Sequence, residues 1–171
     1  VTRRTFILTC TAAALPACGV RPRSGGARRY AASIHPVAAI LTPLIGGRAG
    51  VDSIVARNAS PHTYEARPAD AVLAESALAL FYVADDLDGW AVSLPTAERI
   101  ALMEFVPESL RQPWPEEAGG HDHDHDGDHQ HHDDAHFWSD PLTVAAMLPK
   151  IAEALQRLDP DGAAGYAAQA G

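Results

Sequence analysis

Residues 77–84 read ALALFYVA, a stretch of eight residues that contains no charged side chain. A continuous apolar run of this length is typical of a strand that is buried on both faces of a parallel sheet. The stretch therefore predicts the central strand of the domain, and the segments on either side of it can be interpreted against that strand.

Three further stretches favour strands, and three favour helices. The strands are residues 30–34 (YAASI), 51–57 (VDSIVAR) and 100–106 (IALMEFV), and the helices are residues 36–45, 68–76 and 141–158. Residues 85–98 are interpreted as loop with a short helix around Trp90, and residues 163–171 as the start of another helix. Strands that alternate with helices indicate an α/β domain with a mostly parallel sheet flanked by helices.

The predicted helices carry start and stop signals, and two of them contain an internal proline. Gly46-Gly47 end the first helix, and Ser139 or Asp140 can cap the start of the last one. Proline lacks a backbone donor, so we expect Pro43 to kink or shorten the first helix and Pro149 to kink the last.

Seven of the nine histidines lie between residues 116 and 140. Residues 116–134 also hold eight acidic residues and no basic one, so this stretch predicts a solvated, disordered loop. Its imidazoles are good ligands for zinc or a similar borderline metal. We interpret six of them as a low-affinity metal collector: His121, His123, His125, His129, His131 and His132.

Three other histidines fall in loops that follow predicted strands, namely His35, His62 and His136. Ligands of parallel sheets bind at the carboxyl ends of the strands, so three histidines at that rim would have the geometry of a metal site. The only cysteines are Cys10 and Cys18, which excludes a cysteine-based metal site in the rest of the chain.

Residues 1–18 have the features of an export signal, with Arg3-Arg4 before a short apolar run. Residues 2–8 resemble a twin-arginine signal, and residues 15–18 (LPAC) resemble a bacterial lipobox with lipid attached at Cys18. A plain cleaved secretory signal is the alternative. Residues 19–29 are predicted to be a linker, and residues 30–171 the folded domain.

The chain of 171 residues has a net charge of −9, which makes nucleic acid an unsuitable partner. Outside the histidine-rich loop acidic and basic residues are nearly balanced, so the excess acidity belongs to the loop and suits attraction of cations.

Five features together resemble the zinc and manganese solute-binding proteins of bacterial ABC importers. They are SIHP at residues 33–36, ASPHTYE at 59–65 followed by Arg67-Pro68, the histidine-rich loop, HFWSDP at 136–141, and Asp159-Pro160 with Tyr166. Ser139 stands where that family more usually has leucine. The resemblance covers about residues 30–171, and its second and fourth features are the specific ones.

This resemblance implies that His62 and His136 are metal ligands on the N-terminal lobe of a two-lobed, chelatase-like solute-binding fold. In that family a rigid helix joins the lobes, and a histidine and a carboxylate of the second lobe complete the site. We expect this chain to be the first lobe only, with the second lobe absent. Water, His35 or a loop histidine could then complete the coordination, although capping or pocket lining suits His35 better.

The predicted function is capture of Zn²⁺, in preference to Mn²⁺, for delivery to the membrane permease of a metal ABC importer. The protein would act in the periplasm or at the outer face of the cytoplasmic membrane, with a possible lipid anchor. The alternative is a periplasmic zinc metallochaperone or buffer that works through the loop. An enzyme is not expected, because the chain lacks H-E-x-x-H and G-x-S-x-G motifs.

Overall fold

The computed structural model of the chain describes residues 28–114 and 133–171. The predicted signal peptide, the lipidation at Cys18, nearly all of the predicted linker and the six histidines of the predicted metal collector lie outside the described residues.

Four parallel strands form one sheet in the order β2-β1-β3-β4. They are β1 (Arg29–Ala32), β2 (Gly50–Ser53), β3 (Leu80–Tyr82) and β4 (Arg99–Ala101). The order places β1 and β3 in the centre, and β3 lies within the apolar run at residues 77–84, as predicted. The predicted fold class, a parallel sheet flanked by helices, is confirmed.

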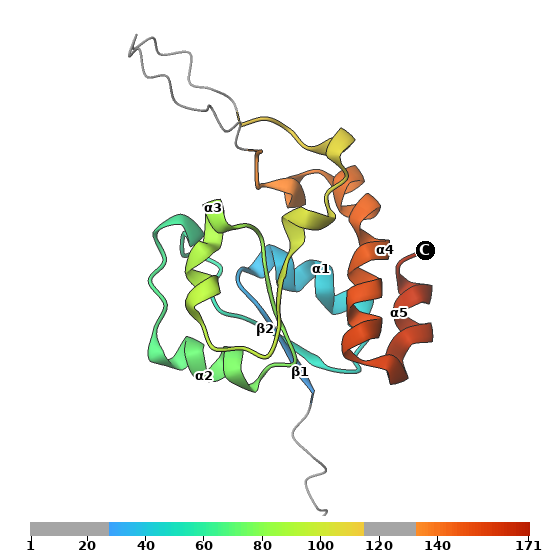
Figure 1. Ribbon diagram of the computed structural model, residues 1–171, viewed down its shortest axis with the longest axis horizontal. Coiled ribbons are helices and arrows are strands. Elements are labelled where there is room, and N and C mark those ends of the chain that lie inside the picture. The colour runs from blue at the N-terminus through green and yellow to red at the C-terminus, as the bar shows by residue number, and fades with distance from the viewer. Residues whose placement is uncertain (1–27, 115–132) are drawn as a thin grey trace, which may run out of the picture.

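Helices cover both faces of this sheet (Figure 1). They are α1 (His35–Ile45), α2 (Pro68–Ser76), α3 (Asp85–Asp88), α4 (Pro141–Leu158) and α5 (Ala163–Gln169). Single turns of 3₁₀ helix include η1 (Pro61–Thr63), η2 (Gly89–Ser93) and η5 (Phe137–Ser139). No helix among the described residues is both long and apolar enough to cross a membrane.

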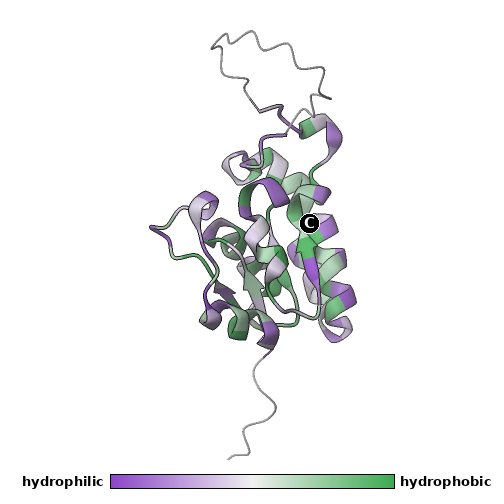
Figure 2. Ribbon diagram, turned by 60° about the vertical axis from the view of Figure 1, so that its left-hand side comes forward, coloured by the Kyte–Doolittle hydropathy of each residue, from purple (hydrophilic) through white to green (hydrophobic). Residues whose placement is uncertain are grey.

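The core lies on both sides of the sheet because neighbouring strand residues point to opposite faces. Tyr30 and Phe81 pack into the larger cluster with α1, α4 and α5, whereas Ala31 and Leu80 pack into the smaller one with α2 and η2. Each large apolar side chain buried in this way contributes about 1.5–3 kcal/mol. Hydrophilic residues gather on the outer sides of the helices (Figure 2).

The helix ends follow the predicted signals. The end of α1 is at Gly46, whose φ of 60° is the left-handed conformation that glycine adopts without strain. Asp140 caps α4 by accepting hydrogen bonds from the backbone N–H groups of Leu142 and Thr143. Pro43 and Pro149 are both inside helices, and neither shortens its helix.

The predicted strand at residues 100–106 is mostly wrong. Only β4 is extended there, and Leu102–Phe105 form a 3₁₀ helix. Ile100 and Leu102 are both buried and keep the alternation of a strand, but the next buried side chain is Val106, four residues further on, as in a turn. The strand that pairs with β4 is β3, which is also only three residues long and provides no further strand residues for pairing.

The buried carboxylate of Asp159 links the C-terminal segment to the residues that precede β1 and β2. This carboxylate accepts hydrogen bonds from Tyr166 Oη at 2.6 Å and from Arg48 Nη2 at 3.1 Å, and it also pairs with Arg28. The Tyr166 hydroxyl and the two guanidinium groups outweigh the effect of burial and hold the pKa of Asp159 below its ordinary value. The start of β1 and the turn before α5 are thereby joined.

Candidate metal centre

His62 and His136, which are 74 positions apart in the sequence, lie beside one another in the structure. The centres of their rings are 5.6 Å apart, and the ring planes are inclined by 40°. Two imidazoles that share one tetrahedral zinc, each with a Zn–N distance of about 2.0–2.1 Å, have ring centres about 5 Å apart. The observed separation of the two ring centres is therefore close to the separation that a shared zinc ion requires.

Both rings line a cavity of about 390 Å³ that is also lined by Asp86, Leu87, Trp114, Asp133 and Ala135. Asp86 is in α3, which directly follows β3, so the cavity lies beyond the carboxyl end of a central strand. That is the edge at which open parallel sheets bind their ligands. The two carboxylates among the lining residues favour a cation over an anion.

The segment that carries His62 is held by its backbone and by its neighbours. Pro61 occupies the first position of η1, and its carbonyl accepts a hydrogen bond of 3.1 Å from Trp90 Nε1 in η2. The Tyr64 ring packs on the Trp90 ring with a centroid distance of 4.8 Å. His62 itself is exposed, so this packing places the loop and leaves the imidazole accessible.

Asp70 in α2 completes the support of this loop. Its carboxylate accepts hydrogen bonds from Tyr64 Oη at 2.7 Å and from the Arg67 backbone N–H at 2.8 Å, and the Arg67 guanidinium pairs with it. Burial by itself would raise the pKa of Asp70, but these hydrogen bonds outweigh it and hold the pKa below its ordinary value. Asp70 therefore joins the end of the loop that carries His62 to the start of α2.

Helix α3, which brings Asp86 and Leu87 to the cavity, is held by the fully buried Asp88. The Asp88 carboxylate accepts hydrogen bonds from the backbone N–H groups of Val83 at 2.9 Å and Ala84 at 3.0 Å. Burial raises the pKa of Asp88 despite these bonds, because a charged carboxylate loses its hydration there.

His136 is held in a different way, by a bond to its ring. Asp134 Oδ1 accepts a hydrogen bond from the His136 backbone N–H at 2.9 Å and lies 2.7 Å from Nδ1 of the His136 ring. Partial burial would raise the pKa of Asp134, but the bonds from His136 lower it below the ordinary value. The sequence reasoning missed this residue because it assigned Asp134 to the disordered loop.

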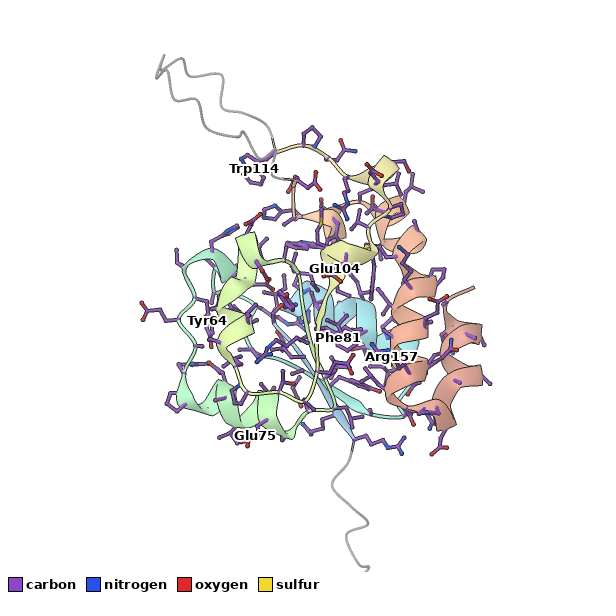
Figure 3. The ribbon with its side chains drawn as sticks, viewed as in Figure 1. Tyr64, Glu75, Phe81, Glu104, Trp114 and Arg157 are labelled. Carbon is purple, nitrogen blue, oxygen red and sulfur yellow. The ribbon has the colours of Figure 1, made fainter. Side chains whose placement is uncertain are left out.

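Aromatic rings surround the His136 imidazole. Trp138 lies 5.0 Å and Trp114 lies 5.7 Å from it, measured between ring centres. Phe137 is buried and contacts Trp138 edge-on, which ties this segment to the core. Figure 3 shows Trp114 at the end of the molecule opposite the start of β1, with Phe81 near its middle.

The two ends of the histidine-rich segment meet beside the cavity. Asp133 forms a single antiparallel bridge with Pro113 and pairs with Arg111 at 3.2 Å. The Asp134 backbone N–H donates a hydrogen bond of 2.6 Å to the Gln112 carbonyl. Asp133 and Asp134, which were predicted to belong to a disordered loop, are therefore part of the folded body.

The structure does not bring every predicted site residue to this place. His35 is the first residue of α1 and is not among the residues that line the cavity. Asp70 accepts the hydrogen bonds in the loop of His62, where Glu65 is exposed. Within residues 28–114 and 133–171, no group of three or more His, Cys, Asp or Glu side chains is close enough to hold a metal. The described part of the chain thus offers a pair of imidazoles and not a complete coordination sphere.

Comparison with known proteins agrees with this geometry. Residues 31–171 match the family model of ZnuA, described as the periplasmic component A of a zinc-uptake complex. The high-affinity zinc uptake system protein ZnuA of Paracoccus denitrificans is 32% identical to the chain, and the match covers 92% of this chain and 54% of that protein. The chain therefore spans about half the length of this relative.

Solved structures show the same fold. The Zn(II)-bound AdcAII variant of Streptococcus pneumoniae superimposes with a TM-score of 0.68 and 20% identity over 86% of this chain and 53% of that one. The Mn-bound periplasmic metal-binding protein of Candidatus Liberibacter asiaticus gives a TM-score of 0.63 and 18% identity over 84% and 50%. Each solved chain is about twice as long as the part that matches.

The suspected family is thus shown by sequence as well as by fold. Its members are solute-binding transport proteins, so the prediction that the chain is not an enzyme is also confirmed. A pair of imidazoles lies at the carboxyl edge of the four-stranded parallel sheet, and the family model matches residues 31–171. The chain therefore belongs to the ZnuA family of periplasmic zinc-uptake components.

Proposed function

We propose that this chain binds Zn²⁺ outside the cytoplasm, as the metal-binding component of an ABC importer, and passes the ion to the membrane permease. The observation that carries the proposal is the 5.6 Å separation of the His62 and His136 rings in one cavity. Each ring would contribute one nitrogen to the ion, which is the cargo of the protein.

The choice of zinc rests on the donor atoms. Imidazole nitrogens suit zinc, whereas manganese is better served by carboxylates and other oxygen ligands. The relative from Paracoccus denitrificans is named for zinc uptake, and the solved relatives include Zn-bound and Mn-bound proteins. Two imidazoles fill half of a four-coordinate zinc site, so in this chain water or a loop histidine would occupy the other positions.

Capture and release follow from the protonation and exposure of these groups. A histidine binds metal through an unprotonated nitrogen, so zinc competes with protons for both rings. His62 is exposed and His136 is partly exposed, so an ion can enter and leave without any movement of the core. The acidic side chains of the cavity and the net charge of −9 raise the local concentration of cations.

The proposal can be tested by titrating the chain with zinc while recording tryptophan fluorescence. Trp114 and Trp138 flank the His136 ring, so their emission responds to an ion bound at this ring. We expect His62→Ala and His136→Ala each to weaken binding by more than about 100-fold, because removal of a ligand costs more than removal of a group behind it. Equal affinity in the wild type and both variants would refute the site.

Deletion of residues 121–132 separates this proposal from a zinc buffer that works through the histidine-rich segment. Under our proposal one tighter site that depends on His62 and His136 survives in the deletion variant, and the additional weaker ions are lost. Under the buffer alternative nearly all zinc binding is lost. His35→Ala belongs in the same series, and retained affinity is expected because His35 does not line the cavity.

A further inference from the structure

The carboxylate of Asp134 makes two contacts with His136, one to the backbone and one to the ring. We propose that Asp134 is a positioning residue, which holds the His136 ring with its hydrogen on Nδ1 and so presents Nε2 to the metal. The benefit to zinc binding rests on the proposed function, but the state of the ring does not and can be measured without metal.

The geometry decides which ring nitrogen carries the hydrogen. An ionised carboxylate has no hydrogen to donate and can only accept. Because Asp134 Oδ1 lies 2.7 Å from Nδ1, that nitrogen must be the donor, and Nε2 of a neutral ring is left with its lone pair. A carboxylate placed behind a metal-binding histidine in this way fixes the tautomer and the orientation of the ring.

Asp134 can orient the ring because its own position is held. Its backbone N–H donates to the Gln112 carbonyl at 2.6 Å, and its neighbour Asp133 bridges to Pro113. Its Oδ1 also accepts from the His136 backbone N–H at 2.9 Å, so one oxygen binds both the backbone and the ring of the same residue. Trp138 and Trp114 restrict the ring further by lying against it.

His62 provides an internal comparison. Within residues 28–114 and 133–171, no hydrogen bond reaches the ring of His62, although its loop is held by Trp90. The two imidazoles of the site therefore differ: a carboxylate holds the ring of His136, and no described residue forms a hydrogen bond with the ring of His62. If Asp134 served only to close the turn before η5, the bond to the backbone N–H would suffice and the ring tautomer would not depend on it.

The experiment is a measurement of the His136 tautomer in the metal-free full chain by two-bond ¹H–¹⁵N correlation NMR. His136→Ala identifies the signals of this ring among those of the nine histidines. The wild type should show the Nδ1–H form. Asp134→Ala should shift the tautomer ratio towards Nε2–H by at least about tenfold, because a hydrogen bond to a charged group is lost. Asp134→Asn, which keeps an acceptor oxygen, should restore much of the Nδ1–H form.

Glu108→Ala is the matched control. It removes an exposed carboxylate that does not line the cavity. It should leave the tautomer unchanged. In parallel zinc titrations, Asp134→Ala should lower the affinity by about 10–100-fold, and Glu108→Ala should change it little.

Two results would overturn the inference. The first is an unchanged Nδ1–H tautomer in Asp134→Ala. The second is unchanged zinc affinity in Asp134→Ala, in a series where His136→Ala does weaken binding. If His136→Ala has no effect on zinc affinity, the proposed function fails instead, and the tautomer measurement still decides whether Asp134 orients the ring.

Discussion

The two histidines of the site are carried by segments of different construction. The His62 segment, residues 58–67, is held from outside by Trp90 and Asp70, which bind its backbone and Tyr64. The His136 segment, residues 133–140, is held from within: Asp134 binds the ring, Phe137 enters the core and Asp140 caps α4. The first arrangement fixes the position of the loop, whereas the second fixes the orientation of the imidazole ring.

Under the proposed function, one imidazole of the site is oriented before the metal arrives. An ordered ring loses little further conformational freedom on binding, which favours affinity. A ring without such a bond can rotate to meet the ion and to release it. The following predictions test whether the two segments really differ in this way.

The largest expected effect is on the His136 segment and its anchor in the core. Phe137→Ala should lower the free energy of unfolding by about 3–5 kcal/mol, because it leaves a cavity in a packed region. Urea unfolding followed by circular dichroism would measure it. Leu142→Ala, at an exposed side chain one turn further on, is the control and should stay within about 0.5 kcal/mol. A small loss in Phe137→Ala would mean that this segment is not anchored from within.

A smaller effect is expected when the support of the His62 segment is removed. Asp70→Ala leaves the Tyr64 hydroxyl and the Arg67 backbone N–H without their acceptor, which should cost about 1–3 kcal/mol. It should also weaken zinc binding, because the loop of His62 is loosened. Glu65→Ala changes an exposed carboxylate of the same loop and should alter neither quantity. If both variants behave alike, Asp70 does not hold the loop.

The single bond from Trp90 should matter less again. Trp90→Phe keeps a ring against Tyr64 but removes the Nε1 donor to the Pro61 carbonyl, with an expected loss of about 0.5–1.5 kcal/mol. Trp114→Phe, at a tryptophan that is 50% exposed, should change the stability by less than about 0.5 kcal/mol. Thermal unfolding of the two variants side by side would rank them, and the reverse order would count against our account of the loop.

The smallest effect is a dependence of stability on pH. The folded-state pKa of Asp70 lies below its ordinary value, so ionised Asp70 stabilises the fold at pH values above about 4, the pKa of an unfolded aspartate. That contribution is lost as the pH falls through the lowered folded pKa. The stability difference between wild type and Asp70→Asn should therefore shrink from about pH 7 to about pH 3. A difference that stays constant would show that the charge of Asp70 is not involved.

Much of the fold could be predicted because its signals are local. Proline at a helix start, Gly46 at a helix end and Asp140 as a cap act within a few residues, and each was identified correctly. The strand at residues 100–106 was predicted wrongly because a short apolar run does not show whether it will pair with a neighbouring strand or fold into a turn. The edge strand β4 is limited by the length of β3, which lies in another part of the chain.

The site was predicted in part. His62 and His136 were identified from motifs and from their positions after strands, and the structure brings them together. Asp134, Asp70 and Trp114 were missed, although Asp134 has a local signal: an aspartate two residues before a histidine can accept from that residue's backbone N–H. Trp114 carries no such signal, since it reaches the His136 ring only through the meeting of two distant segments.

By itself, the sequence determined the α/β class, the central strand and the histidines worth testing, because periodicity, capping and residue chemistry are properties of short stretches. Only the tertiary structure decided that two of those histidines share a cavity, that His35 stays outside it, and that a carboxylate holds one ring while no described residue forms a hydrogen bond with the other. The physical reason is that the strand order and the contacts of the two loops, Trp90 with Pro61 and Asp133 with Pro113, bring together residues that no local pattern connects.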